Sequence, residues 1–205
     1  MFFVMPINRR DKPRFDAYVD GILLDNNDEL ATNSFIYGAE VKEEAGKSYK
    51  IKTNQEFSEI GKIKDRLVTK VHNTPIFIVS ENFKELLQNN FSGQAEFFEV
   101  KFDIVNKKPL EGYFICNILS IYNCIDYENS IVDYEFYDEN EKGHGQIYTI
   151  DSMVIDESKI PIDAHIFLLG NFPKPIILVS QEMRNAIEDR GITGFSFVNP
   201  EDFMI

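Results

Sequence analysis

The chain has 205 residues, of which 43% are hydrophobic and 13% aromatic, and this composition excludes an intrinsically disordered protein. Its 34 acidic and 21 basic side chains leave a net charge of −13. A charge of that sign argues against direct binding to nucleic acids or anionic membranes, because both need a basic surface. We therefore expect an acidic globular protein whose partners are neutral or basic.

The expected compartment is the cytoplasm. The N-terminal residues show no secretion-signal pattern, and no apolar run reaches the length of a membrane-spanning helix. The two cysteines, Cys116 and Cys124, are predicted to be reduced and partly buried thiols. A disulfide or a metal pair is the alternative, although a lone C-x7-C spacing is not that of a zinc knuckle.

The first third of the chain, residues 1–73, is predicted to be rich in strands joined by polar turns. Strand-forming runs lie at 2–5, 34–41 and 49–52. Apolar residues recur at helical spacing over 55–71, which predicts a helix there, although a glycine within the run weakens that interpretation.

An internal repeat predicts two strand–Ser–helix–strand units, at about 75–102 and 175–198. In each copy a short apolar run ends in a serine, Ser80 or Ser180, and an amphipathic segment follows. A serine at this place caps the free N–H groups of a helix, so we interpret both as N-caps and not as nucleophiles. Two copies suggest pseudo-symmetric halves of one fold, and a chance similarity is the alternative.

The middle of the chain is dense in strand-forming residues, and these complete the predicted fold class. The runs are 112–122 (one strand, or two joined by a bend), 130–137, 146–150 and 164–169. We predict an α+β fold in which a sheet-dominated body packs against two or three helices. It is expected to form a single domain over residues 1–205, with 1–73 as an N-terminal portion and 74–205 as the core.

No catalytic, metal or cofactor site is predicted. Residues 143–145 form a bare G-x-G without a following helix, which is not a phosphate-binding loop. A calcium loop starting at Asp138 fails because its twelfth position is Thr149 and not glutamate. The histidines lack metal-ligand spacing, and only His144, between two glycines, suggests an exposed contact residue.

The strongest candidate for a functional site is acidic. Between residues 126 and 141 the chain carries seven carboxylates, no basic residue and several aromatic rings. A solvated face is one interpretation. The other is a docking surface, because acids steer a basic partner and aromatic rings anchor it. The candidate partner-binding residues are Asp126, Glu128, Asp133, Tyr134, Glu135, Tyr137, Asp138, Glu139 and Glu141.

Several short motifs resemble a known family. They are Tyr113–Leu119, Asn123–Ser130 with Asp126, the run 162–169, Ile177–Ser180 and Gly191–Phe197. Together these residues, within about 74–200, resemble the Imm11-type immunity proteins of bacterial polymorphic toxin systems. The resemblance implies a cytoplasmic protein without chemistry of its own that binds and blocks a cognate secreted toxin. It also implies a gene beside an effector of contact-dependent or type VI secretion, some of which are nucleases.

The charge pattern and the resemblance agree on one mechanism. A nuclease toxin presents a basic groove to its substrate, and an acidic inhibitor can occupy that groove by imitating phosphate charge. Two other classes stay open: a hydrolase that uses buried carboxylates on an unknown substrate, and a structural or scaffold protein. The sequence predicts neither an oligomeric state nor a role for Asp126, Ser130 or His144 beyond shaping turns or making contacts.

Overall fold

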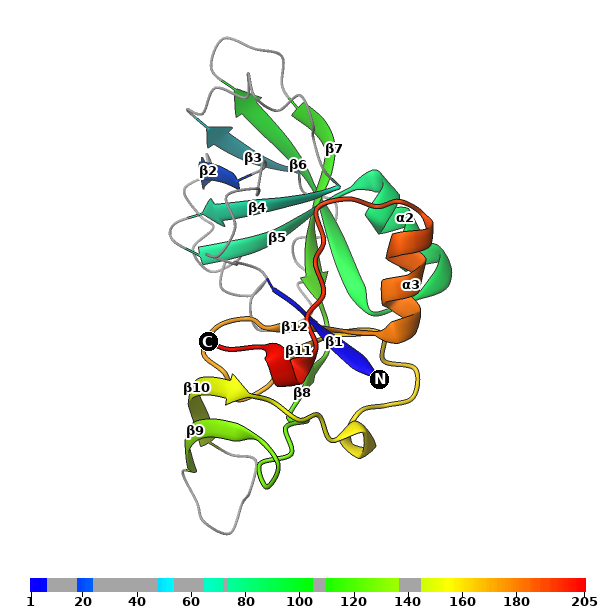
Figure 1. The fold of residues 1–205 in the computed structure, drawn as a ribbon. Helices are drawn as coiled ribbons and strands as arrows, with labels where there is room; N and C mark the ends of the chain where they lie inside the picture. The colour runs from blue at the N-terminus through cyan, green and yellow to red at the C-terminus, as the bar shows by residue number, and fades with distance from the viewer. Residues whose placement is uncertain (7–17, 24–47, 54–64, 72–73, 105–109, 137–144) are drawn as a thin grey trace. The chain divides into compact units, whose positions relative to one another are not determined.

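The computed structural model describes residues 1–6, 18–23, 48–53, 65–71, 74–104, 110–136 and 145–205 (Figure 1). The chain divides into two compact units. The barrel unit consists of residues 7–119 and 187–195, and the sheet unit consists of residues 1–6, 120–186 and 196–205. The fold is mixed α+β and dominated by strands, as the sequence predicts.

A closed barrel forms the body of the barrel unit. In spatial order its described strands are β2 (Tyr18–Leu23), β3 (Ser48–Thr53), β6 (Ala95–Ile104), β7 (Leu110–Ile118), β5 (Thr74–Ser80) and β4 (Arg66–Val71). Strand β6 shows the alternation that a barrel wall requires, because Val100 and Phe102 are fully buried while Glu99 is exposed. Ile51, Ile78 and Ile115 are also fully buried in the core of this unit.

Helix α2 (Glu81–Asn90) follows β5 directly. Its N-cap is Ser80, whose hydroxyl accepts a hydrogen bond from the Phe83 amide at 3.4 Å, as the repeat predicts. The Phe83 ring is fully buried and stacks on Phe195, with centroids 4.7 Å apart and an interplanar angle of 14°. Aromatic stacking therefore holds the returning C-terminal segment against the barrel unit.

A four-stranded sheet and a hairpin form the sheet unit. The sheet has the order β1 (Phe2–Met5), β12 (Ile177–Ser180), β11 (Ile166–Leu169), β8 (Ile121–Tyr122), and the hairpin pairs β9 (Ile131–Phe136) with β10 (Gly145–Ser152). Strands β11 and β12 are buried at every position, which explains their uninterrupted apolar sequence. Helix α3 (Gln181–Asp189) follows β12, and two 3-10 turns, η3 (Glu157–Lys159) and η4 (Pro200–Asp202), complete the described elements.

The strand, serine and helix of the predicted internal repeat are present in both copies, but the closing strand expected at 195–198 is not. Ser180 caps α3 as Ser80 caps α2, since its hydroxyl accepts from the Met183 amide at 3.1 Å. The resemblance extends to neighbouring strands: Val79 pairs with Phe114 and Val179 pairs with Phe3. In both copies a cation from the helix lies over that phenylalanine ring.

Lys84 on α2 has its Nζ 3.9 Å from the centroid of Phe114, and Arg184 on α3 has its guanidinium carbon 4.5 Å from the centroid of Phe3. The closing strand differs between the copies. The first copy ends in β6, whereas residues 195–198 contribute a single antiparallel bridge between Val198 and Val4. The chain turns through a positive φ of 87° at Gly194, just before this segment.

The helix prediction for residues 55–71 is also wrong. The helix expected over 55–71 is a strand at its C-terminal end, because residues 66–71 form β4, paired antiparallel with β5 and parallel with β2. The apolar spacing of a helix also fits a β-branched strand, and barrel closure decides between them. Residues 55–64 and the strand expected at 34–41 lie outside the described residues.

Apart from 195–198, the other predicted strands within the described residues are present with adjusted ends. The run 112–122 forms two strands, β7 and β8, and the run 164–169 begins its strand at Ile166. Cys116 and Cys124 are buried free thiols, as predicted, and burial raises the pKa of the Cys124 thiol to about 12. Within the described ranges, no helix is long and apolar enough to cross a membrane.

Candidate functional site

The described part of the predicted acidic site lies on the β9–β10 hairpin and on the turn that leads into it. The inner face of the hairpin belongs to the core of the sheet unit, because Ile147 and Ile150 are buried and Val132 packs against them. Successive residues of a strand point to opposite faces. Asp133 and Glu135 therefore point outward, and both are exposed.

Two further side chains belong to this outward face. Ile131 is 63% exposed. Tyr148 is an extra residue of β10, placed where the register shifts between the Ile147 and Thr149 pairs. Its hydroxyl donates a 2.7 Å hydrogen bond to the Glu135 carboxylate, so its half-exposed ring lies beside that acid. We call Ile131, Asp133, Glu135 and Tyr148 the acidic hairpin face.

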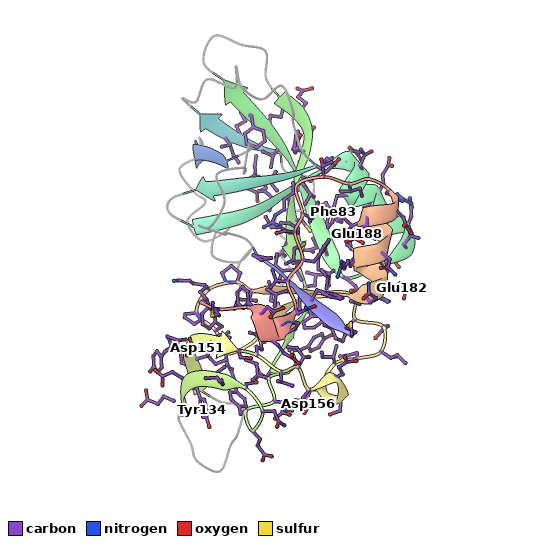
Figure 2. All side chains as sticks on the ribbon, in the orientation of Figure 1. Phe83, Tyr134, Asp151, Asp156, Glu182 and Glu188 are labelled. Atoms are coloured by element: carbon purple, nitrogen blue, oxygen red, sulfur yellow. The ribbon has the colours of Figure 1, made fainter. Side chains whose placement is uncertain are left out.

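Tyr134, a predicted contact residue on β9 (Figure 2), lies between Asp133 and Glu135 in the sequence and therefore points to the opposite face of the strand. It pairs in register with the buried Ile147, and its ring packs on Tyr127 with centroids 4.8 Å apart. It still keeps 38% of its surface exposed. The Tyr127 ring is partly buried against the core of the sheet unit, and burial raises the pKa of its phenol. Tyr134 thus joins the core to the surface at the edge of the hairpin.

Asp126 shapes the turn before β9. Its carboxylate accepts hydrogen bonds from the Asn129 side chain at 2.7 Å and from the amides of Glu128 and Asn129 at 3.0 and 3.3 Å. These bonds, that of the Asn129 side chain first, hold the pKa of Asp126 below its usual value. The Glu128 side chain is exposed at the tip of this turn.

Ser130 closes the same turn. Its hydroxyl accepts from the Val154 amide at 2.9 Å and faces the Val154 carbonyl at 3.4 Å. Asp126 and Ser130 therefore fix the shape of the turn through hydrogen bonds to backbone groups, which is a common role of Asp and Ser side chains. Four of the predicted contact residues, Tyr137, Asp138, Glu139 and Glu141, lie outside the described residues, as does His144.

A second polar constellation lies in the barrel unit, at the start of α2. The Asp65 carboxylate accepts hydrogen bonds from Ser80 Oγ at 2.7 Å, from the Thr193 amide at 2.8 Å, from Thr193 Oγ at 2.9 Å and from Asn82 at 3.3 Å. Sequence reasoning missed this group, because Asp65 and Thr193 are 128 residues apart. No local motif marks such a pair.

Asp65 is suited to structure and not to proton transfer. Burial alone would raise its pKa, but the hydrogen bonds from Thr193, Ser80 and Asn82 outweigh burial and hold the pKa below its ordinary value. A general acid or base near neutral pH needs the opposite shift. Within the described ranges, no group of three or more His, Cys, Asp and Glu side chains could hold a metal ion.

The comparison with protein families decides the identity of the chain. The model of the Immunity protein family (Imm11) matches residues 28–202. The chain belongs to this family. The match starts well before the motifs that carry the sequence resemblance, so it includes much of the first third of the chain. No curated protein matches the chain.

Family membership implies that this immunity protein neutralises a cognate toxin, and proteins of this kind are generally not enzymes. Its charge is distributed unevenly between the two units. The sheet unit carries fourteen Asp and Glu against four Lys and Arg, a net charge of −10. The barrel unit carries twenty acids against seventeen bases, a net charge of −3. The unit that holds the acidic hairpin face therefore carries most of the excess.

Proposed function

We propose that this immunity protein blocks its toxin by occupying the toxin's active groove. The sheet unit supplies the contact surface through the acidic hairpin face together with Asp138, Glu139 and Glu141, which follow β9 in the sequence. The observation that carries the proposal is the net charge of −10 on the sheet unit. A surface of this sign fits the basic groove of a toxin that acts on a phosphate-bearing substrate such as nucleic acid.

The acidic hairpin face combines charge with apolar surface. Asp133 and Glu135 are exposed, and Ile131 is 63% and Tyr148 47% exposed. Long-range attraction by carboxylates raises the rate of association, whereas apolar and aromatic side chains supply most of the affinity once they are desolvated. Protection against a lethal enzyme calls for a Kd in the nanomolar range or below, about −12 kcal/mol. Charge alone seldom provides that affinity.

The hairpin is also a rigid platform. Ile147 and Ile150 fix β10 in the core of the sheet unit, and the Tyr148 hydroxyl holds the Glu135 carboxylate at 2.7 Å. A carboxylate already held in place loses less conformational entropy when a partner binds. Residues 138, 139 and 141 add three acids between β9 and β10 in the sequence. We include them in the proposed surface on the basis of their place in the sequence.

The test is a neutralisation assay with the purified chain and the toxin encoded by the adjacent gene. We expect inhibition to reach completion at a fixed molar ratio and both proteins to elute together, because an occupying inhibitor is not turned over. Inhibition at far below stoichiometric amounts, lost on changing one carboxylate, would instead identify an enzyme. The absence of any complex at micromolar concentrations would refute the proposal.

A pair of matched variants locates the surface. Asp133→Asn with Glu135→Gln removes two charges from the acidic hairpin face. Glu85→Gln with Asp189→Asn removes two charges from exposed positions on the helices α2 and α3, both within the barrel unit. We expect the first pair to slow association with the toxin by about tenfold at low salt and the second to change it little. Equal effects would place the contact surface elsewhere.

A further inference from the structure

We propose that strand β9 is an open sheet edge to which the toxin adds an extended, basic segment, so that the complex contains an intermolecular β-sheet. This inference rests on the proposed function and states how the acidic hairpin face binds. It commits to one occupant: a strand with Lys or Arg at two alternate positions.

The hairpin is covered on one side only, in the part of the chain that the structure describes. The C-terminal residue Ile205 exchanges two backbone hydrogen bonds with Ile150 of β10, at 2.8 and 2.9 Å. Asn171 accepts a further bond from the Ile147 amide at 2.8 Å. Strand β10 therefore lies between these segments and β9, whose partner among the described strands is β10. This arrangement makes β9 the edge.

The backbone direction at this edge follows from the same bonds. Ile150 faces Val132 in register, but the N–H and C=O of Ile150 form their hydrogen bonds with Ile205 and not with Val132. Opposed residues of an antiparallel pair alternate between hydrogen-bonded and non-hydrogen-bonded pairs, so Val132 and Ile150 form a non-hydrogen-bonded pair. The N–H and C=O of Val132 then point away from β10, toward the open edge. The same direction recurs at every second residue of β9.

The edge is regular. Both register shifts of the hairpin insert a residue in β10, next to Ile147 and next to Ile150, and none inserts a residue in β9. The sequence Ile131–Phe136 contains no proline or lysine, which commonly protect an edge from pairing, and its two acids, Asp133 and Glu135, disfavour only a partner strand of like charge. Strand β9 therefore runs without a bulge over its six residues, and an incoming strand meets the outward backbone groups of Val132 in regular geometry.

The charges on β9 select the occupant. Asp133 and Glu135 alternate along the edge and point to one face. A second copy of this acidic strand would place like charges opposite each other, which is destabilising. A strand with Lys or Arg opposite Asp133 and Glu135 forms two favourable cross-strand pairs. The residue between those bases would face the half-exposed ring of Tyr134, which favours a β-branched or aliphatic side chain there.

The first test uses peptides and the full-length, isotopically labelled chain. The probe is acetyl-Thr-Lys-Val-Lys-Thr-amide, with glutamates in place of both lysines as the charge control. We expect the basic peptide to shift the amide resonance of Val132 and its neighbours. The acidic peptide should bind at least about tenfold more weakly. N-methylation of the central valine removes the donor that faces β9 and should abolish the shifts. N-methylation of a lysine, whose N–H points to solvent, should leave them.

The second test uses the complex with the toxin encoded by the adjacent gene, followed by amide hydrogen exchange. We expect the outward Val132 amide to be slowed by about tenfold or more on binding. The Asp133 amide, which points toward β10, is the internal control and should change little. A complex that forms while Val132 exchanges at its free rate overturns strand addition but leaves the proposed function standing. If no complex forms, the proposed function fails, and the peptide series decides strand addition by itself.

Discussion

Replacing Asp65 with alanine tests how the barrel unit holds its C-terminal segment. The carboxylate accepts three short hydrogen bonds, from Ser80 Oγ at 2.7 Å, the Thr193 amide at 2.8 Å and Thr193 Oγ at 2.9 Å. A buried bond to a charged group contributes about 1.5–3 kcal/mol, and partial exposure of Asp65 lowers this to about 1 kcal/mol each. We therefore expect Asp65→Ala to reduce the free energy of unfolding by about 3 kcal/mol.

The effect should depend on pH in a defined direction. The hydrogen bonds hold the pKa of Asp65 below the ordinary value of 3.8. A carboxyl group with a lowered folded-state pKa stabilises the fold above the unfolded pKa and loses that contribution as pH falls through the folded pKa. The difference between wild type and Asp65→Ala should therefore be full at neutral pH and shrink below about pH 4.

Denaturant unfolding at neutral and acidic pH measures this difference. Glu85→Ala is the control, because Glu85 is an exposed carboxylate on α2, and surface changes of this kind usually stay within about 0.5 kcal/mol. If Asp65→Ala lowers the free energy of unfolding equally at both pH values, the packing of the side chain and not its charge explains the loss. The absence of a loss at neutral pH would refute the reasoning altogether.

Two further predictions concern the backbone and the repeat. Gly194→Ala should destabilise by about 2–4 kcal/mol in thermal unfolding, because Gly194 has a positive φ and a Cβ there would lie 2.9 Å from the Arg66 carbonyl oxygen. Gly93→Ala, with similar φ but open space, should cost only about 1 kcal/mol, and equal losses would contradict the clash. Ser180→Ala should lower the free energy of unfolding by about 1 kcal/mol, because it removes the cap of α3. Ser180→Asp keeps a capping oxygen beside the His165 imidazole and should restore that stability in unfolding and refolding measurements. A Ser180→Asp variant as unstable as Ser180→Ala would contradict the capping role.

The local features of the fold could be predicted from the sequence. Ser80 and Ser180 are N-caps because their side-chain chemistry and the apolar runs before them act within a few residues. The repeat is readable for the same reason. Barrel closure could not be predicted from the sequence, because it depends on pairing between strands that are distant in the chain. In addition, the apolar spacing of residues 66–71 fits a helix as well as a strand.

The candidate site divides in the same way. Clustering of acids around Asp133 and Glu135 is visible in the sequence, and so is the turn at Asp126. Tyr148 was missed because its place depends on an irregularity in the register of β10. The strand pattern predicts that the side chains of Tyr134 and its neighbours alternate between the two faces of β9. Which of them face the core depends on the register with Ile147 across the hairpin, and the sequence does not show that register.

The contact surface is the central claim, and one affinity measurement addresses it most directly. The variant carries alanine at Asp133, Glu135, Asp138 and Glu139 together, and its Kd for the toxin of the adjacent gene is compared with that of the wild-type chain. We expect a loss of about a hundredfold or more, in step with a loss of protection in growing cells. An unchanged Kd would mean that the toxin docks on another face of this immunity protein.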